Sequence, residues 1–208
     1  VQYFKRTFTP NGSYLVVVGD ITLEQTKVAV EKNFGSWSGG AVYKAELVSA
    51  NSAKGNRVIF VNKAGADQSV ISITYPLDIK PSNEDYLKLK VLDGILGGGV
   101  FGNRLMQNLR EDKGYTYGCR SRARVDNYGS TFSAGGNFRN DVTDSAIVEI
   151  LMELDRITEG LVEDEELSMT KSSMAGSFAR SLEQPSTVAR FALNIIRNEL
   201  PKDYYQKI

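Results

Sequence analysis

The sequence has no histidine and only one cysteine. Without histidine, the chain cannot carry the H-x-x-E-H signature through which one class of zinc enzymes holds its metal. The single cysteine, Cys119, excludes a disulfide within the chain and leaves the redox compartment open. Cys119 could be a reactive thiol or a small apolar residue in a strand, and the absence of a histidine base favours the apolar role.

The sequence also lacks long apolar runs and a net charge. The longest runs, such as Tyr14 to Val18, are far below the ~20 residues of a membrane span. Lys plus Arg equals Asp plus Glu at 25 each, so no global field favours nucleic acid or an anionic membrane. The chain shows no signal peptide and begins at Val1, which suggests a cropped or mature fragment and leaves periplasmic and cytoplasmic locations equally open.

Residues 1–38 predict a strand followed by a helix. Tyr14–Val18 is typical of a buried strand and ends at Gly19-Asp20. Thr22 and Gln25 have the spacing of a capping box for a helix that ends before Gly35. Residues 39–56 are rich in Gly, Ser, Ala and Asn and predict a linker.

Residues 57–208 predict a larger domain of grouped strands and helices. Expected strands are 57–63, 68–75, 115–125 and 131–138, and expected helices start near Ser82 or Asn83 and span 142–159, 164–182 and 186–200, with a short helix around Leu105–Leu109. This order predicts an α+β fold, in which helices cover one face of an antiparallel or mixed sheet.

A glycine cluster lies between two of the expected helices. Gly97, Gly99 and Gly102 formally match G-x-G-x-x-G, and Gly98 belongs to the same cluster. A nucleotide-dependent enzyme would need a strand running directly into Gly97. The preceding helical pattern instead favours a helix-to-helix junction, where missing side chains let two backbones or a peptide approach closely.

Two clusters of charged residues each have a functional and a purely structural interpretation. Arg120, Arg122 and Arg124 alternate along one strand and therefore share a face, which could neutralise anionic groups or simply be solvated. Net neutrality and the lack of interleaved aromatic residues argue against nucleic acid. The acidic run 163–166 stands at a helix start, where interaction with the helix N-terminus is a sufficient explanation.

Arg110 and Tyr117 are the candidate substrate-binding pair. Arg110 ends a short predicted helix, Gly114 permits the chain to reverse, and Tyr117 lies early in the next strand. A guanidinium and a phenol can both donate hydrogen bonds to a peptide carbonyl and stabilise negative charge that develops on it. Strict alternation places Tyr117 on the face opposite the arginines, unless a bulge reverses the register.

Residues 101–117 (FGNRLMQNLREDKGYTY) resemble the second-domain motif of the M16 peptidases, the pitrilysin, insulinase and mitochondrial processing peptidase family. Residues 3–37, with PNG at 10–12 and VVVGD at 16–20, are similar to the end of the domain that precedes it. The resemblance implies a clam-shaped assembly of homologous α+β domains around a chamber. Zinc and a glutamate base belong to one half, and Arg110 and Tyr117 would hold the peptide in the other.

The resemblance implies that this chain alone is inactive, holds no cofactor and needs a partner domain or subunit that carries H-x-x-E-H and zinc. It also implies that the strand and helix of residues 14–35 fill a vacant sheet position, within one molecule or by exchange in a homodimer, because an unpaired edge invites association. The alternative is a catalytically silent structural or assembly subunit of the same fold.

Overall fold

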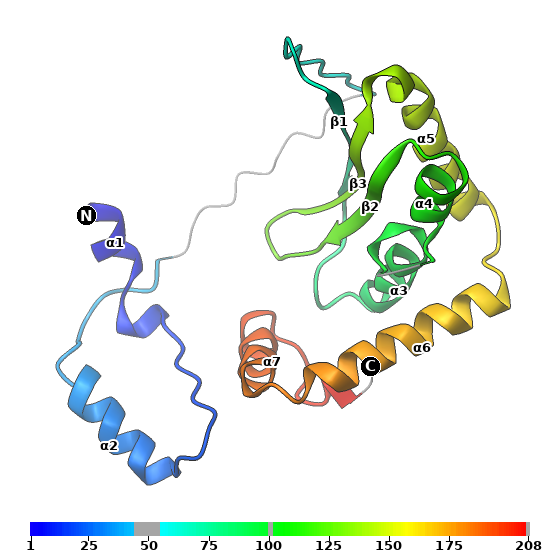
Figure 1. Ribbon diagram of the computed structural model, residues 1–208. Coiled ribbons are helices and arrows are strands. Elements are labelled where there is room, and N and C mark those ends of the chain that lie inside the picture. The colour runs from blue at the N-terminus through cyan, green and yellow to red at the C-terminus, as the bar shows by residue number, and fades with distance from the viewer. Residues whose placement is uncertain (44–54, 100–101, 207–208) are drawn as a thin grey trace. The chain divides into compact units, whose positions relative to one another are not determined.

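The computed structural model describes residues 1–43, 55–99 and 102–206. Contacts divide the chain into two units, Val1–Ala50 with Ser177–Ile208 and Asn51–Gly176. The second unit contains the sheet and is the part that positions the candidate site (Figure 1).

The sheet of the described residues has three antiparallel strands in the order β1-β3-β2. These are β1 (Gln68–Leu77), β2 (Thr116–Arg124) and β3 (Ser130–Arg139). In the turn between β2 and β3, the Asp126 carboxylate accepts hydrogen bonds from the backbone N–H groups of Tyr128 and Gly129, each at 2.8 Å. This Asx-type turn confirms the turn expected there and brings the two strands together.

One face of the sheet carries the core. It is covered by α3 (Asp85–Asp93), the π-helical segment η2 (Gly94–Gly98), α4 (Arg104–Met106), the π-helical segment η3 (Gln107–Asp112) and α5 (Thr143–Glu159) (Figure 1). The fully buried apolar side chains all belong to this layer and to the strand residues facing it: Leu96, Leu105, Leu109, Cys119, Phe138, Ala146 and Ile150. The predicted α+β fold with helices on one sheet face is therefore confirmed.

The glycine junction fixes the position of β2, an edge strand. A Cβ atom on Gly97 would lie 2.5 Å from the Ser121 backbone nitrogen and 2.7 Å from Leu105 Cδ1, so only glycine fits at this contact. One turn earlier, the Asp93 carboxylate accepts from Ser121 Oγ at 2.6 Å and from the Ala123 backbone N–H at 3.2 Å. The helix end thus packs on β2 and satisfies a backbone donor that an edge strand would otherwise leave open.

The other glycines of the junction also lie in tight or turned backbone. A Cβ atom on Gly98 would meet the Asp93 carboxylate at 2.7 Å, and one on Gly99 would meet the Gly94 carbonyl oxygen at 2.7 Å. Gly102 has a φ of +71°, which favours glycine. Since a helix and not a strand runs into Gly97, the expectation attached to a nucleotide-dependent enzyme is wrong.

In the first unit, α2 (Leu23–Phe34) begins with the expected capping box. Thr22 Oγ1 accepts from the Gln25 backbone N–H at 3.2 Å, while Gln25 Oε1 accepts from the Thr22 N–H at 2.9 Å. Its other helices are α1 (Gln2–Thr7), α7 (Pro185–Arg197) and the short 3-10 helices η1 (Pro10–Gly12) and η5 (Tyr204–Gln206), and α6 (Asp164–Ser181) crosses the boundary between the units. At the C-terminal end the Phe191 ring stacks between Phe178 and Tyr205, with centroid distances of 5.6 and 3.7 Å.

Two strand predictions are wrong. Tyr14–Val18 and residues 57–63 form no strand, so Tyr14–Val18 fills no position in the described sheet; their apolar side chains are exposed, as with Phe60 at 85%, except for half-buried Val16. Most of the expected linker, residues 44–54, lies outside the described residues. No helix in the described ranges combines the length and apolar character needed to cross a bilayer.

The Gly97 contact can be tested by replacing it with alanine. Alanine favours a helix over glycine by about 1 kcal/mol, but here its Cβ would push against the Ser121 backbone. We expect Gly97→Ala to lower the free energy of unfolding by about 2 kcal/mol, measured by urea denaturation. Gly129→Ala is the control, because a Cβ there meets nothing within 4 Å. Equal stability of the two variants would contradict the close approach.

Candidate functional site

A β-bulge near the start of β2 decides where Tyr117 points. Thr116 pairs with Phe138 and Cys119 pairs with Gly136, so two residues, Tyr117 and Gly118, stand opposite Asn137 alone. The Thr116 hydroxyl stabilises this irregularity by accepting from the Gly118 backbone N–H at 3.0 Å and by contacting the carbonyl oxygens of Gly118 and Asn137. The extra residue reverses the side-chain alternation on one side of the bulge.

The bulge places Tyr117 on the open face of the sheet. Phe138 and Gly136 lie on the helix-covered side with buried Cys119, whereas Asn137 lies on the other side. Tyr117 is 89% exposed and therefore shares the open face with the arginines of β2. Of the two arrangements that the sequence left open, the structure has the one with a bulge, which brings Tyr117 to the face of the arginines instead of the face opposite them.

Arg110 lies at the helix-to-strand reversal that leads to Tyr117. The reversal is closed by hydrogen bonds from the Gly114 N–H to the Arg110 carbonyl at 3.0 Å and from the Tyr115 N–H to the Leu109 carbonyl at 2.9 Å. Gly114 adopts a φ of +62°, as the reversal requires. The Arg110 side chain is 45% exposed, and its Nε lies 3.4 Å from Glu111 Oε1. Such an exposed ion pair is weak and easily exchanged for another acceptor.

The arginines of β2 extend the open face beyond Tyr117. Arg120, Arg122 and Arg124 are exposed, while the intervening Cys119, Ser121 and Ala123 face the helices. Arg124 Nε lies 3.6 Å from Asp126 Oδ2. Hydrogen bonds from the Gly129 and Tyr128 backbone N–H groups, and to a smaller extent Arg124, lower the pKa of the Asp126 carboxyl. Arg120 and Arg122 have no acidic partner within the described ranges.

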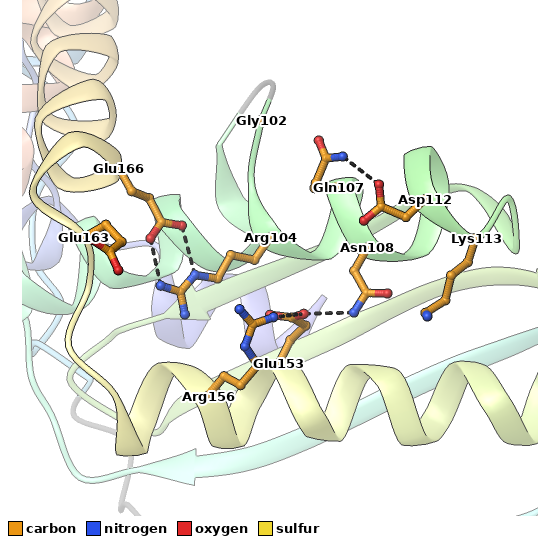
Figure 2. A pocket seen from close by; sticks show the side chains of 10 residues that line it. All are labelled: Gly102, Arg104, Gln107, Asn108, Asp112, Lys113, Glu153, Arg156, Glu163 and Glu166. Atoms are coloured by element: carbon orange, nitrogen blue, oxygen red, sulfur yellow. Dashed lines mark hydrogen bonds and ion pairs between the residues drawn. The ribbon is translucent and has the colours of Figure 1, made fainter.

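A polar cleft lies on the other side of the molecule's second unit, among the helices (Figure 2). It has a volume of about 490 Å³ and lies between α4 with η3, α5 and the start of α6. Arg104 and Glu166 form a two-pronged ion pair there, with Nε–Oε1 at 2.9 Å and Nη2–Oε2 at 2.7 Å. These hydrogen bonds raise the pKa of the Arg104 guanidinium above its usual value. The acidic run at 163–166 thus does more than cap α6.

Glu153 forms the floor of the same cleft (Figure 2). Its side chain is 3% exposed, and its Oε1 accepts from Asn108 Nδ2 and Arg156 Nη1, both at 2.8 Å. Its Oε2 has no partner in the part of the chain that the structure describes. The network links η3, which carries Arg110, to α5. Sequence reasoning missed it, because the Asn108–Glu153 and Arg104–Glu166 contacts join residues 45 and 62 positions apart and leave no local pattern.

The residues that the structure describes do not form a zinc site. No histidine is present, and the described residues contain no group of three or more Cys, Asp or Glu that could hold a metal ion. Burial raises the pKa of the Cys119 thiol to about 12, which disfavours its thiolate form, and the side chain is fully buried in the core. The prediction that Cys119 is a small core residue of a strand is confirmed.

The Arg104–Glu166 pair should contribute measurably to stability. The two side chains keep only 15% and 26% exposure, so Arg104→Met would leave a largely desolvated carboxylate without its partner. We expect a loss of about 2 kcal/mol in unfolding free energy by urea denaturation, less than for a fully buried pair. The matched control is Lys88→Met, because the Lys88–Asp85 pair is 80% and 64% exposed and should contribute little. A loss no larger than that of the control would refute the anchoring role.

Comparisons with known proteins agree with the fold and the motif. A family model described as the peptidase M16 inactive domain matches residues 1–174. Two curated relatives are "Uncharacterized zinc protease YmxG" of Bacillus subtilis, 29% identical over 202 residues (96% of this chain, 46% of that protein), and "Non-peptidase homolog YmxG" of Helicobacter pylori, 28% identical over 122 residues (59% and 27%). The chain spans less than half the length of either relative.

Solved structures share the fold at low sequence identity. A protease from Helicobacter pylori superposes with a TM-score of 0.78 at 23% identity, covering 91% of this chain and 47% of that one. The peptidase M16 inactive domain from Pseudomonas fluorescens gives a TM-score of 0.75, also at 23% identity, covering 91% and 44%. With the helix-covered sheet and the match of the family model, these findings place the chain in the peptidase M16 family, as a domain of its inactive type.

Proposed function

We propose that this chain is the non-catalytic, substrate-binding part of a zinc-dependent M16 metallopeptidase, and that it holds the peptide backbone for hydrolysis at a zinc site supplied by a partner domain or subunit. The observation that carries the proposal is the bulge at Tyr117, which turns a phenol outward to 89% exposure in a chain without histidine. Arg110, on the helix leading into the same strand, is also open to solvent.

The chemistry of the pair suits a peptide carbonyl. Tyr117 has one O–H donor that no acceptor of the described residues occupies, and Arg110 has several N–H donors engaged only by the loose contact with Glu111. Donors held toward a carbonyl oxygen stabilise the negative charge that it gains during hydrolysis. In this proposal Arg110 orients the backbone, and Tyr117 donates to the oxygen that becomes anionic.

The need for a partner is supported by what the chain lacks and by its length. The described residues contain no cluster of Cys, Asp or Glu that could hold zinc, and the chain covers only 46% of the Bacillus relative whose name includes "zinc protease". A structural neighbour described as the periplasmic protease PqqL of Escherichia coli is longer still, with 21% of its chain covered. The remaining length of such proteins is where an H-x-x-E-H domain would lie.

Removing the Tyr117 hydroxyl should reduce turnover without weakening the fold. In the assembled enzyme we expect Tyr117→Phe to lower kcat about 100-fold, as for the loss of one oxyanion donor, with urea denaturation unchanged. Tyr128→Phe is the control, since Tyr128 is another exposed phenol, at 73%, in the β2–β3 turn. Unchanged turnover in the Tyr117 variant would reject the assigned role.

The alternative, a structural or assembly subunit that processes nothing, is favoured by the name "Non-peptidase homolog" of the Helicobacter relative. The two functions predict different partners, because only the first requires a protein that carries H-x-x-E-H. Affinity capture that recovers no protein with H-x-x-E-H, together with turnover indifferent to Tyr117, would support this second function.

We also propose a homodimer formed by exchange of the segment that contains Tyr14–Val18. These residues form no strand and, apart from Val16, are exposed, with Leu15 at 59% and Val17 at 46%, and β1 has no strand on its outer side within the described sheet. An unpaired β-edge recruits extended segments.

Light scattering after size exclusion should therefore show a dimer of the 208-residue chain that Val17→Lys converts to monomer, because a lysine in the exchanged strand opposes edge pairing. Val148→Lys, on an exposed position of α5, should remain dimeric. A wild-type chain that is monomeric at all concentrations would rule the exchange out.

A further inference from the structure

The open face of the sheet is cationic, although the chain as a whole carries no net charge. The strands β1, β2 and β3 contain four arginines (Arg120, Arg122, Arg124 and Arg139) and no Asp, Glu or Lys. The alternation of burial places all of these arginines on the open face. Overall, the chain has equal numbers of acidic and basic residues, so the charges are segregated between regions of the surface.

The two arginines at the strand ends are neutralised, but the two in the middle are not. Arg124 lies 3.6 Å from Asp126 and Arg139 lies 3.7 Å from Asp141, each acid standing just beyond its strand. Arg120 and Arg122, here called the arginine pair, have no such partner among the residues described. Two neighbouring like charges repel each other, and a bound anion would relieve that repulsion.

The residues opposite the arginine pair on the neighbouring strands have small, uncharged side chains. Across the sheet Arg120 is opposite Gly135 and then Ser72, and Arg122 is opposite Ser133 and then Thr74. A hollow of about 400 Å³ is lined by both arginines, Ser72, Ser133 and Gly135, and also by residues of the helix-covered side, among them Ile71, Ser121 and Ala134. The one carboxylate in its lining, Asp93, is already engaged by Ser121 and Ala123 on the helix side.

We propose that the arginine pair binds acidic side chains of the peptide that Tyr117 holds, which makes peptides with alternating acidic residues the favoured substrate class. This inference rests on the proposed function, because the bulge that exposes Tyr117 also puts it on the face of the arginine pair. Side chains on one side of an extended peptide repeat every ~6.7 Å, the spacing of Arg120 and Arg122 along β2. Two acidic residues at alternate positions, beginning about three residues from the held bond, would meet both guanidinium groups.

Binding of labelled peptides to the 208-residue chain tests the inference by fluorescence anisotropy. Three extended peptides of equal length would carry Glu, Gln or Lys at two alternate positions. We expect the Glu peptide to bind about 10-fold more tightly than the Gln peptide at low ionic strength, the sum of two exposed ion pairs. The preference should fade in concentrated salt, which screens exposed charges.

Substitution of the arginine pair supplies the specific control. Arg122→Glu should abolish the preference for the Glu peptide and improve binding of the Lys peptide. Arg180→Glu makes the same charge change at an exposed position of α6, where Arg180 donates to Ser177 Oγ, and should leave the preference intact. Equal binding of the Glu and Gln peptides would overturn the inference. So would a single-stranded oligonucleotide that binds as tightly as the Glu peptide and is equally sensitive to Arg122→Glu.

The two substitutions, Tyr117→Phe and Arg122→Glu, distinguish failure of this inference from failure of the proposed function. Tyr117→Phe should lower turnover in the assembled enzyme while keeping the discrimination between Glu and Gln peptides. Loss of discrimination in Arg122→Glu with unchanged turnover in Tyr117→Phe would support the acidic specificity and reject the role of Tyr117. A turnover loss in Tyr117→Phe with no acidic preference in the wild-type chain would support the opposite conclusion.

Discussion

The arrangement of the open face depends on the bulge at Tyr117 and Gly118. A regular strand would turn Tyr117 toward the helices, on the same side as Cys119, and the open face would have arginines but no phenol. The inserted residue prevents this, and the Thr116 hydroxyl stabilises it by bonding backbone groups that the bulge leaves out of the ladder. The Thr116 hydroxyl therefore helps to hold the bulge that exposes Tyr117.

In the described sheet β2 is an edge strand and pairs with a neighbour on one side only. A bulge in such a strand needs support from contacts outside the sheet. The helix side supplies this support. Gly97 lets the π-helical end of α3 rest against the β2 backbone, and Asp93 bonds Ser121 and Ala123. The Glu153 network and the Arg104–Glu166 pair then tie η3 and α4 to α5 and α6. The carboxylates that make these contacts, Asp93, Glu153 and Glu166, lie among the helices, so none of these three neutralises an arginine of the open face.

Local patterns predicted much of this fold because their causes are local. The capping box of Thr22 and Gln25, the turn at Asp126–Gly129 and the helical periods of α5 to α7 involve neighbours in sequence, and all are present. The strands expected at Tyr14–Val18 and 57–63 are not formed, because an apolar extended segment becomes a strand only when another edge pairs with it. The Arg104–Glu166 and Asn108–Glu153 contacts join distant positions, so no spacing rule could reveal them.

The candidate pair was visible in the sequence, but its exposure was not, since a two-residue period fails at a bulge. Under the proposed function, this bulge places the phenol where a bound peptide could reach it. Tyr117, at 89% exposure, contributes almost nothing to the core, and a buried phenol would have stabilised the sheet more. A strand that departs from its regular geometry to expose an aromatic side chain, beside arginines without an acidic partner among the described residues, is poorly explained by stability alone. Donors and positive charge gathered on one face, with no carboxylate in the strands, are what an extended polypeptide with a developing negative charge requires.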